Sequence, residues 1–178
     1  IISRNVTRLS ELVNDMLTLS KLESSSALKA EIVQPEELAQ DVVERMASLA
    51  SEKNISIKVI TQAQPFSGDQ TKIEHVLQNL LGNAIKYVQE NAQIEVRWEE
   101  LPKATVLRVS DNGPGIAEIH LSRLFERFYR IDKGRSRDVG GTGLGLSIVK
   151  HIMQSHGGSV TVKSELGKGS EFICVFPK

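Results

Sequence analysis

The sequence of 178 residues lacks most of the features that mark a specialised class of protein. It has a single cysteine, which excludes an internal disulfide framework and favours a reducing compartment. No run approaches the ~18 apolar residues of a membrane-spanning helix, and no charged-then-apolar leader is present. Basic and acidic side chains balance at 22 each, which argues against nucleic acid or an anionic membrane as a partner. Any phosphate binding must therefore be local.

The single cysteine, Cys174, lies in the apolar run 172–176, where a buried strand thiol is expected rather than a reactive one. We expect a cytoplasmic domain that makes no membrane contact. Because the sequence opens at Ile1 inside a helical pattern, it also suggests a piece of a longer chain. Whether that parent protein is anchored in a membrane is left open.

The N-terminal segment has the apolar spacing of a helix that seeks a partner. Its apolar residues alternate at spacings of four and three: Ile2, Val6, Leu9, Val13 and Met16. Further leucines widen the stripe, which favours a four-helix arrangement over a lone zipper. The alternative is an ordinary amphipathic helix packed on its own domain. The polar run 24–26 ends the pattern and predicts a hinge.

The remaining segments alternate between helical and strand patterns. We predict strands near 31–33, 55–59, 94–98, 106–109, 159–163 and 171–176, and helices from Pro35, over about 71–88 and over 144–156. Adjacent antiparallel strand pairs among helices predict an α+β fold, a two-layer sandwich whose mixed sheet is covered by helices on one face. Residues 112–142, rich in glycine and charge, form either a functional lid or a disordered stretch.

Four polar residues lie along one side or at the end of the long predicted helix: Asn79, Asn83, Lys86 and Tyr87. Asparagine is unfavourable inside an apolar helix unless its amide is satisfied, so two at helical spacing suggest a purpose. A carboxamide oxygen is a hard ligand that suits Mg²⁺. The alternative is a pair of capped or solvated asparagines.

A second motif follows a predicted strand, where Asp111 is succeeded by a glycine turn with Gly113, Gly115 and Ile116. An ionised carboxylate only accepts hydrogen bonds, so Asp111 suits the exocyclic amino group of adenine. Glycines there allow the backbone to approach a base. The alternative is a common Asp-Asn-Gly turn.

A third motif is a run of spaced glycines that leads into a helix. Its members are Gly141, Thr142, Gly143, Leu144, Gly145 and Leu146. Free amides at a helix start bind anions, and glycines let phosphate oxygens reach them. A long charged loop, rather than a strand, precedes the run, and Gly-Lys-Ser/Thr is absent. Both the dinucleotide-binding turn and the Walker-type loop are therefore disfavoured.

The segment between these motifs, residues 124–133, contains aromatic and basic side chains. Its aromatic residues are suited to fastening a mobile loop to the core. Arg130 or Lys133 would neutralise a terminal phosphate during transfer. The alternative is a solvated basic loop.

In their order, the motifs resemble the catalytic domain of sensor histidine kinases, within the Bergerat (GHKL) fold shared with gyrase, HSP90 and mismatch-repair ATPases. The N, G1, F and G2 boxes correspond to residues 79–87, 111–115, 125–130 and 141–145. The run 127–137 looks most like the phosphate-responsive sensor kinases of the PhoR family. The resemblance covers nearly the whole chain.

That resemblance implies a role for each site residue. Asn79, Lys86 and Arg130 would be catalytic, and Asn83 would hold Mg²⁺. Tyr87 would flank the nucleotide and Asp111 would bind adenine. The remaining residues would complete the ATP site under a lid of about 112–142: Gly113, Gly115, Ile116, Lys133, Gly141, Thr142, Gly143, Leu144, Gly145 and Leu146.

It also implies a division of the chain and a set of partners. Residues 1–26 would be the second helix of a dimerisation hairpin, and residues 27–178 the ATP-binding catalytic domain. The domain would transfer the γ-phosphate of ATP to a histidine on another helix, for relay to the receiver domain of a response regulator. The full protein would be a homodimer.

The four histidines depart from the family's acceptor pattern, in which an acidic residue follows the histidine. They are His75, His120, His151 and His156, and each is followed by an apolar residue or glycine. We therefore expect them to be surface or packing residues, and the chain to bind ATP without phosphorylating itself.

Two other functions are weighed against this one. The first is a hydrolytic ATPase or serine kinase of the same superfamily, whose members use a glutamate four residues before the magnesium-binding asparagine. Here that position is Asn79, which cannot accept a proton at neutral pH. The second is a non-catalytic module that dimerises and senses nucleotide.

Overall fold

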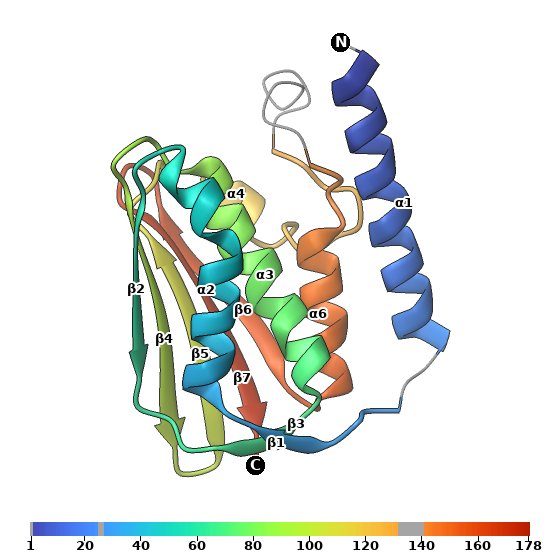
Figure 1. Ribbon diagram of the computed structural model, residues 1–178, viewed down its shortest axis with the longest axis vertical. Helices are drawn as coiled ribbons and strands as arrows, with labels where there is room; N and C mark the ends of the chain where they lie inside the picture. Colours follow the sequence, from blue (N-terminus) through green and yellow to red (C-terminus); the bar gives the residue numbers. More distant parts are fainter. Residues whose placement is uncertain (1, 25–26, 132–140) are drawn as a thin grey trace.

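The computed structural model describes residues 2–24, 27–131 and 141–178. One mixed sheet has the strand order β2–β4–β5–β7–β6, comprising β2 (Ser56–Thr61), β4 (Gln93–Leu101), β5 (Ala104–Asp111), β7 (Gly169–Pro177) and β6 (Ser159–Glu165). Helices α2 (Pro35–Ser51), α3 (Gln70–Tyr87) and α6 (Gly145–Ser155) cover one face of this sheet (Figure 1). The predicted two-layer α/β sandwich is confirmed.

The strand pairing explains why the sheet is mixed. β2 pairs with β4 in parallel, and each of the other neighbouring pairs is antiparallel. Along β4 the side chains alternate strictly, so Ile94, Val96 and Trp98 are buried while the residues between them are partly exposed. This alternation is the pattern of a strand with one face against the core.

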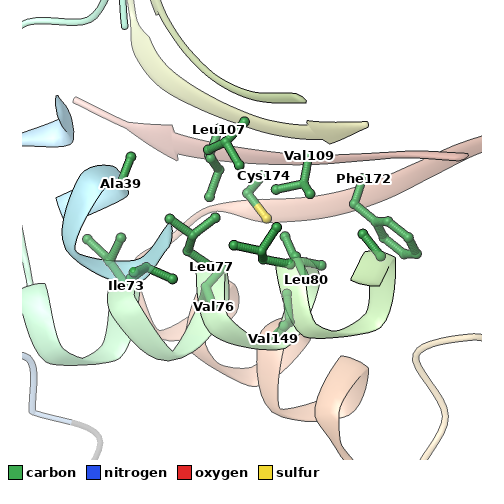
Figure 2. Packing of buried hydrophobic residues seen from close by; sticks show 14 of the residues in the cluster. Ala39, Ile73, Val76, Leu77, Leu80, Leu107, Val109, Val149, Phe172 and Cys174 are labelled. Atoms are coloured by element: carbon green, nitrogen blue, oxygen red, sulfur yellow. The ribbon is translucent and has the colours of Figure 1, made fainter. Parts of the chain in front are cut away.

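The core lies between the sheet and the helices. The α3 side chains Ile73, Val76 and Leu77 are fully buried, and each contributes roughly 1.5–3 kcal/mol by leaving water. They face strand residues such as Leu107 and Cys174 (Figure 2). Burial raises the pKa of the Cys174 thiol far above its ordinary value, so the prediction of an unreactive strand cysteine is confirmed.

Helix α1 (Ile2–Ser24) stands beside α6 at the edge of the helical layer (Figure 1). Near its C-terminal end Leu19 is buried, and Leu22 packs against the core. Other residues of its stripe are open, since Val6, Leu9, Val13, Met16 and Leu17 are 48–62% exposed. The helix therefore packs on its own domain at one end and presents an uncovered apolar face along the other.

The predicted strand at 31–33 is confirmed, but two short elements, β3 (Phe66–Gly68) and α4 (Glu118–Leu121), were not predicted. β1 (Glu31–Val33) pairs with β3 in a separate two-stranded sheet, and α4 lies within the predicted lid. Each has only three or four residues, which is too short for a periodic pattern to identify. Within the described part of the chain, no helix combines the length and the apolar character needed to cross a bilayer.

Candidate functional site

Helix α3 is fixed at both ends, which places its polar side chains. At its start the Asp69 side chain accepts a hydrogen bond from Lys72 N at 3.1 Å, an N-cap. At its end the Lys53 ammonium donates to three carbonyls, those of Ile85 at 2.8 Å, Lys86 at 2.9 Å and Val88 at 3.2 Å. A cation there complements the helix dipole.

The polar side of α3 lies directly against the glycine run 141–145. Asn79 Nδ2 donates to the His75 carbonyl at 2.8 Å, and a Cβ on Gly145 would lie 2.5 Å from Asn79 Oδ1. Likewise, a Cβ on Gly141 would collide with Lys86 Nζ. The structure thus brings Asn79 and Lys86 together with this run, and a Cβ at Gly141 or Gly145 would have to displace the Lys86 ammonium or the Asn79 carboxamide.

The two other predicted site residues of α3, Asn83 and Tyr87, lie toward the C-terminal end of the helix. Asn83, one turn after Asn79, is partly exposed. Tyr87 is 53% exposed, and Lys86 Nζ lies 5.4 Å from the centroid of its ring. Partial burial raises the pKa of the Tyr87 phenol and the nearby Arg130 guanidinium lowers it, so Arg130 belongs to the same corner.

Asp111 ends β5 at the border of this corner. Its Oδ1 accepts a hydrogen bond from Gly113 N at 2.8 Å. Burial raises the pKa of the carboxyl group, and hydrogen bonds from the Gly113 and Ser170 backbones oppose that rise. Asp111 is therefore an acceptor of fixed orientation, as a purine amino group requires.

The turn after Asp111 is anchored to the β6–β7 connection. Ile116 N donates to Ser164 Oγ at 2.8 Å, and Gly167 N donates to the Pro114 carbonyl at 2.8 Å. Gly115 has φ +69°, and a Cβ there would collide with the Glu165 carbonyl. Gly115 and Ile116 thus hold the turn against the sheet, which is a different reason for glycine from the expected approach to a base.

The glycine run is held by neighbours on both sides. Gly143 has φ +76°, and its carbonyl accepts from Phe128 N at 2.9 Å. Thr142 Oγ1 accepts from Leu144 N at 3.1 Å and donates to Asp15 Oδ2, on α1, at 2.5 Å. Leu144 is fully buried and Leu146 packs partly against the core, which fixes the start of α6.

The aromatic segment before the run is fastened to the core at its beginning. Leu124 is buried, and Phe125 packs edge-on against Phe172 with ring centroids 6.5 Å apart. Phe128, by contrast, is 57% exposed and has φ +61°. Lys133 and the lid residues 132–140 lie outside the described residues.

Residues that the sequence patterns did not reveal also contribute to the site. The contacts of these residues span long stretches of the chain: Asp15 contacts Thr142 across 127 positions, Lys53 contacts the end of α3 across 32–35 positions, and Ser164 contacts Ile116 across 48 positions. No local motif marks them. A groove of about 310 Å³ between α1 and α3 has Asp15, His75 and Asn79 among its lining residues, and a hollow of about 430 Å³ near the end of β5 adjoins Asp111 and Ser164.

Comparison with known families finds one match that covers most of the chain. Residues 68–178 match the family model of histidine kinase-, DNA gyrase B- and HSP90-like ATPases. The sensor protein SrrB of Staphylococcus aureus (strain NCTC 8325 / PS 47) is 36% identical over 173 residues, which are 96% of this chain and 30% of that protein. The chain therefore spans less than a third of the length of this curated relative.

Solved structures of histidine kinases share the fold. Full-length ShkA in complex with AMPPNP matches with a TM-score of 0.85 and 32% identity, over 95% of this chain and 35% of that chain. ThkA in complex with the response regulator protein TrrA matches with a TM-score of 0.80 and 28% identity, over 100% of this chain and 49% of that chain. The histidine kinase AdeS of Acinetobacter baumannii matches with a TM-score of 0.80 and 26% identity, over 97% of this chain and 79% of that chain.

Proposed function

Because this chain belongs to the histidine kinase-, DNA gyrase B- and HSP90-like ATPase family, we propose that it binds ATP between α3, the glycine run and the end of β5. We propose further that it is the catalytic part of a two-component sensor histidine kinase. The observation that supports this most directly is the contact of Asn79 and Lys86 with Gly145 and Gly141. It joins a carboxamide, a cation and a helix start where phosphates would bind.

Each end of the nucleotide has a matching set of groups. Asp111 accepts the adenine amino group, and Tyr87 flanks the nucleotide. At the other end, Gly141, Gly143 and Gly145 lead into the N-terminus of α6, whose free amides bind phosphate oxygens. Lys86 and Arg130 neutralise the charge that develops on the transferred group.

The donor set also fits Mg²⁺ carried by the nucleotide. Asn83 offers a neutral, partly exposed carboxamide oxygen. Within the described residues, no group of three or more His, Cys, Asp or Glu side chains is placed to hold a metal. Mg²⁺ at a nucleotide site needs only one or two protein ligands, because it takes its other ligands from phosphates and water. When bound there, the ion would neutralise phosphate charge and orient the γ-phosphate.

The proposed reaction is transfer of the γ-phosphoryl group to a histidine that lies outside these residues. The bond between the γ-phosphorus and the β–γ bridging oxygen breaks, a P–N bond forms to one ring nitrogen, and the proton on the other nitrogen leaves to a base. Relay to an aspartate of a response regulator would follow. The solved complex of ThkA with TrrA supports such a partner.

We assign residues 1–26 to a dimerisation hairpin and residues 27–178 to the catalytic domain. The support is the uncovered stripe on α1, from Val6 to Leu17, which needs an apolar partner. A second helix and a second copy of the full protein would cover it. The finer likeness to the PhoR family rests on the run 127–137, and it stays a prediction.

A hydrolytic ATPase or a serine kinase is the main competing function. Both need a carboxylate at the position that Asn79 occupies, and here the Asn79 amide is bonded to the His75 carbonyl. A non-catalytic nucleotide sensor would keep the binding groups alone. Vigorous ATP hydrolysis by the chain would favour the first, and failure to phosphorylate any histidine would favour the second.

Calorimetric titration with Mg·AMPPNP tests the nucleotide site. We expect saturable binding that Asp111→Asn weakens by about 1.5–3 kcal/mol, because the substitution replaces a charge-assisted hydrogen bond to adenine. Asp41→Asn, on the exposed side of α2, removes the same charge and should leave the affinity unchanged. Absence of saturable binding to the unsubstituted chain would refute the proposal, and unchanged affinity in Asp111→Asn would refute the role of Asp111.

A further inference from the structure

Helix α1 places a carboxylate at the glycine run. The Thr142 hydroxyl donates to Asp15 Oδ2 at 2.5 Å and accepts from Leu144 N at 3.1 Å. The hydroxyl proton is therefore directed to Asp15 and away from any ligand of the run. Asp15 is partly buried, which strengthens its electrostatic effect relative to a solvated side chain.

The groove between α1 and α3 locates Asp15 independently. Asp15 lines this groove together with Asn79, whose Oδ1 faces Gly145 at the start of α6. Two separate observations, the bond to Thr142 and the shared groove with Asn79, thus put the carboxylate at the end of the site where we have placed the phosphates.

Contacts near the C-terminal end of α1 hold the helix in this position. Leu19 is 7% exposed, and the Leu22 carbonyl lies 3.2 Å from His151 Nε2 on α6. Asp15 lies one turn before Leu19 on the same side of the helix. Docking of this end against α6 therefore carries the carboxylate to the glycine run.

We propose that Asp15 is a specificity-determining residue of the nucleotide site and lowers its affinity for triphosphates while α1 is docked. The proposal rests on the function proposed above. Like charges repel, so the carboxylate disfavours ATP more than ADP, and it occupies the Thr142 hydroxyl that would otherwise donate to a phosphate. By linkage, triphosphate binding and α1 docking oppose each other, so movement of α1 alters nucleotide affinity.

Asp15→Asn tests this inference directly, because it removes the charge and keeps the shape. We expect its dissociation constant for Mg·ATP to fall about five-fold, that for Mg·ADP to fall less, and that for adenosine to stay unchanged. The gain in affinity for Mg·ATP should shrink at about 0.5 M salt, because salt screens the repulsion between charges. Asp41→Asn is the matched control and should show none of these changes.

A second variant separates the charge from the position of the helix. Leu19→Asn weakens the docking of α1 without touching the nucleotide site, so it should tighten Mg·ATP binding as Asp15→Asn does. The double variant should gain little more affinity for Mg·ATP than either single variant, because both changes act on the same carboxylate. If Asp15→Asn binds Mg·ATP no more tightly than Asp41→Asn, the inference is overturned while the proposed function stands. If the unsubstituted chain binds no nucleotide, both fall.

Discussion

Lys53 belongs to no motif, yet its side chain fixes the end of α3. Its ammonium donates to three carbonyls at the end of α3, and its carbonyl accepts from Asn91 N at 2.9 Å. All three ammonium protons are used, so the last turn of α3 cannot fray without losing them. Lys86 and Tyr87 leave the helix from this turn. Lys53 is therefore a positioning residue for the corner where we place the nucleotide.

Lys53→Met should both destabilise the chain and weaken nucleotide binding. Loss of the donor leaves carbonyls unsatisfied, which costs about 1–3 kcal/mol in urea denaturation. Looser placement of Lys86 should raise the dissociation constant for Mg·ADP about two- to five-fold. A ten-fold change in a dissociation constant corresponds to about 1.4 kcal/mol of binding free energy, so the expected loss is smaller than that. Lys53→Arg should recover part of both effects. The control is Lys58→Met, at an exposed site on β2.

A purely structural role for Lys53 would give a different result. In a Lys86→Met background, the effect of Lys53→Met on affinity should largely disappear, because the two changes act through one group. An undiminished effect in that background would contradict the assignment, whatever happens to stability.

Helix α3 depends on its first turn as much as on its last. Asp69 is 4% exposed, and its carboxylate accepts from the backbone of Lys72 and of Lys29, each at 3.1 Å. Its own N–H donates to His156 Nε2 at 3.1 Å, so one residue joins the start of α3 to the segment before β1 and to the residue that caps the end of α6. The placement of Asn79 and Asn83 along α3 follows from this anchor.

Asp69→Ala should lower the free energy of unfolding by about 1–2 kcal/mol, because it removes the cap and leaves the backbone amides of Lys72 and Lys29 without their acceptor. Urea denaturation followed by circular dichroism measures the loss. Asp69→Asn, which keeps an acceptor, should lose less. Equal losses in both variants would show that the charge, rather than the hydrogen bonds, supports the helix.

How far the sequence predicts these elements depends on their length and on the separation of their contacts. The start of α2 at Pro35, the bounds of α3 to within a residue, and the β6–β7 hairpin follow from local periodicity. β3 and α4 do not, because three or four residues cannot display a period.

The same distinction holds within the site. The contacts of Asn79 with Gly145 and of Lys86 with Gly141 join motifs that the sequence had already singled out. Thr142 was also singled out, but its partner Asp15 lies 127 positions away on a helix identified only by its apolar stripe. Such a polar contact depends on how α1 docks, which local patterning does not specify.

The chain taken together has the groups that we propose to bind nucleotide, but none of its four histidines has the sequence setting of the family's acceptor. All four histidines lie in the described part of the chain. His120 Nδ1 lies 2.8 Å from the Tyr129 hydroxyl, His151 contacts the Leu22 carbonyl, and His156 accepts from Asp69 N. His75 differs, because it lines the groove beside Asn79.

These positions lead to a prediction about phosphorylation. Incubated with Mg²⁺ and ATP labelled in the γ-phosphate, the chain should remain unlabelled. A version extended upstream through a further helix should acquire a label. That label should be acid-labile, because a P–N bond hydrolyses in acid. His75→Gln serves as the control in both, because it removes the one groove histidine that the described residues contain. Robust labelling of the chain itself, lost in His75→Gln, would move the acceptor into this domain and contradict the proposed division between hairpin and catalytic part.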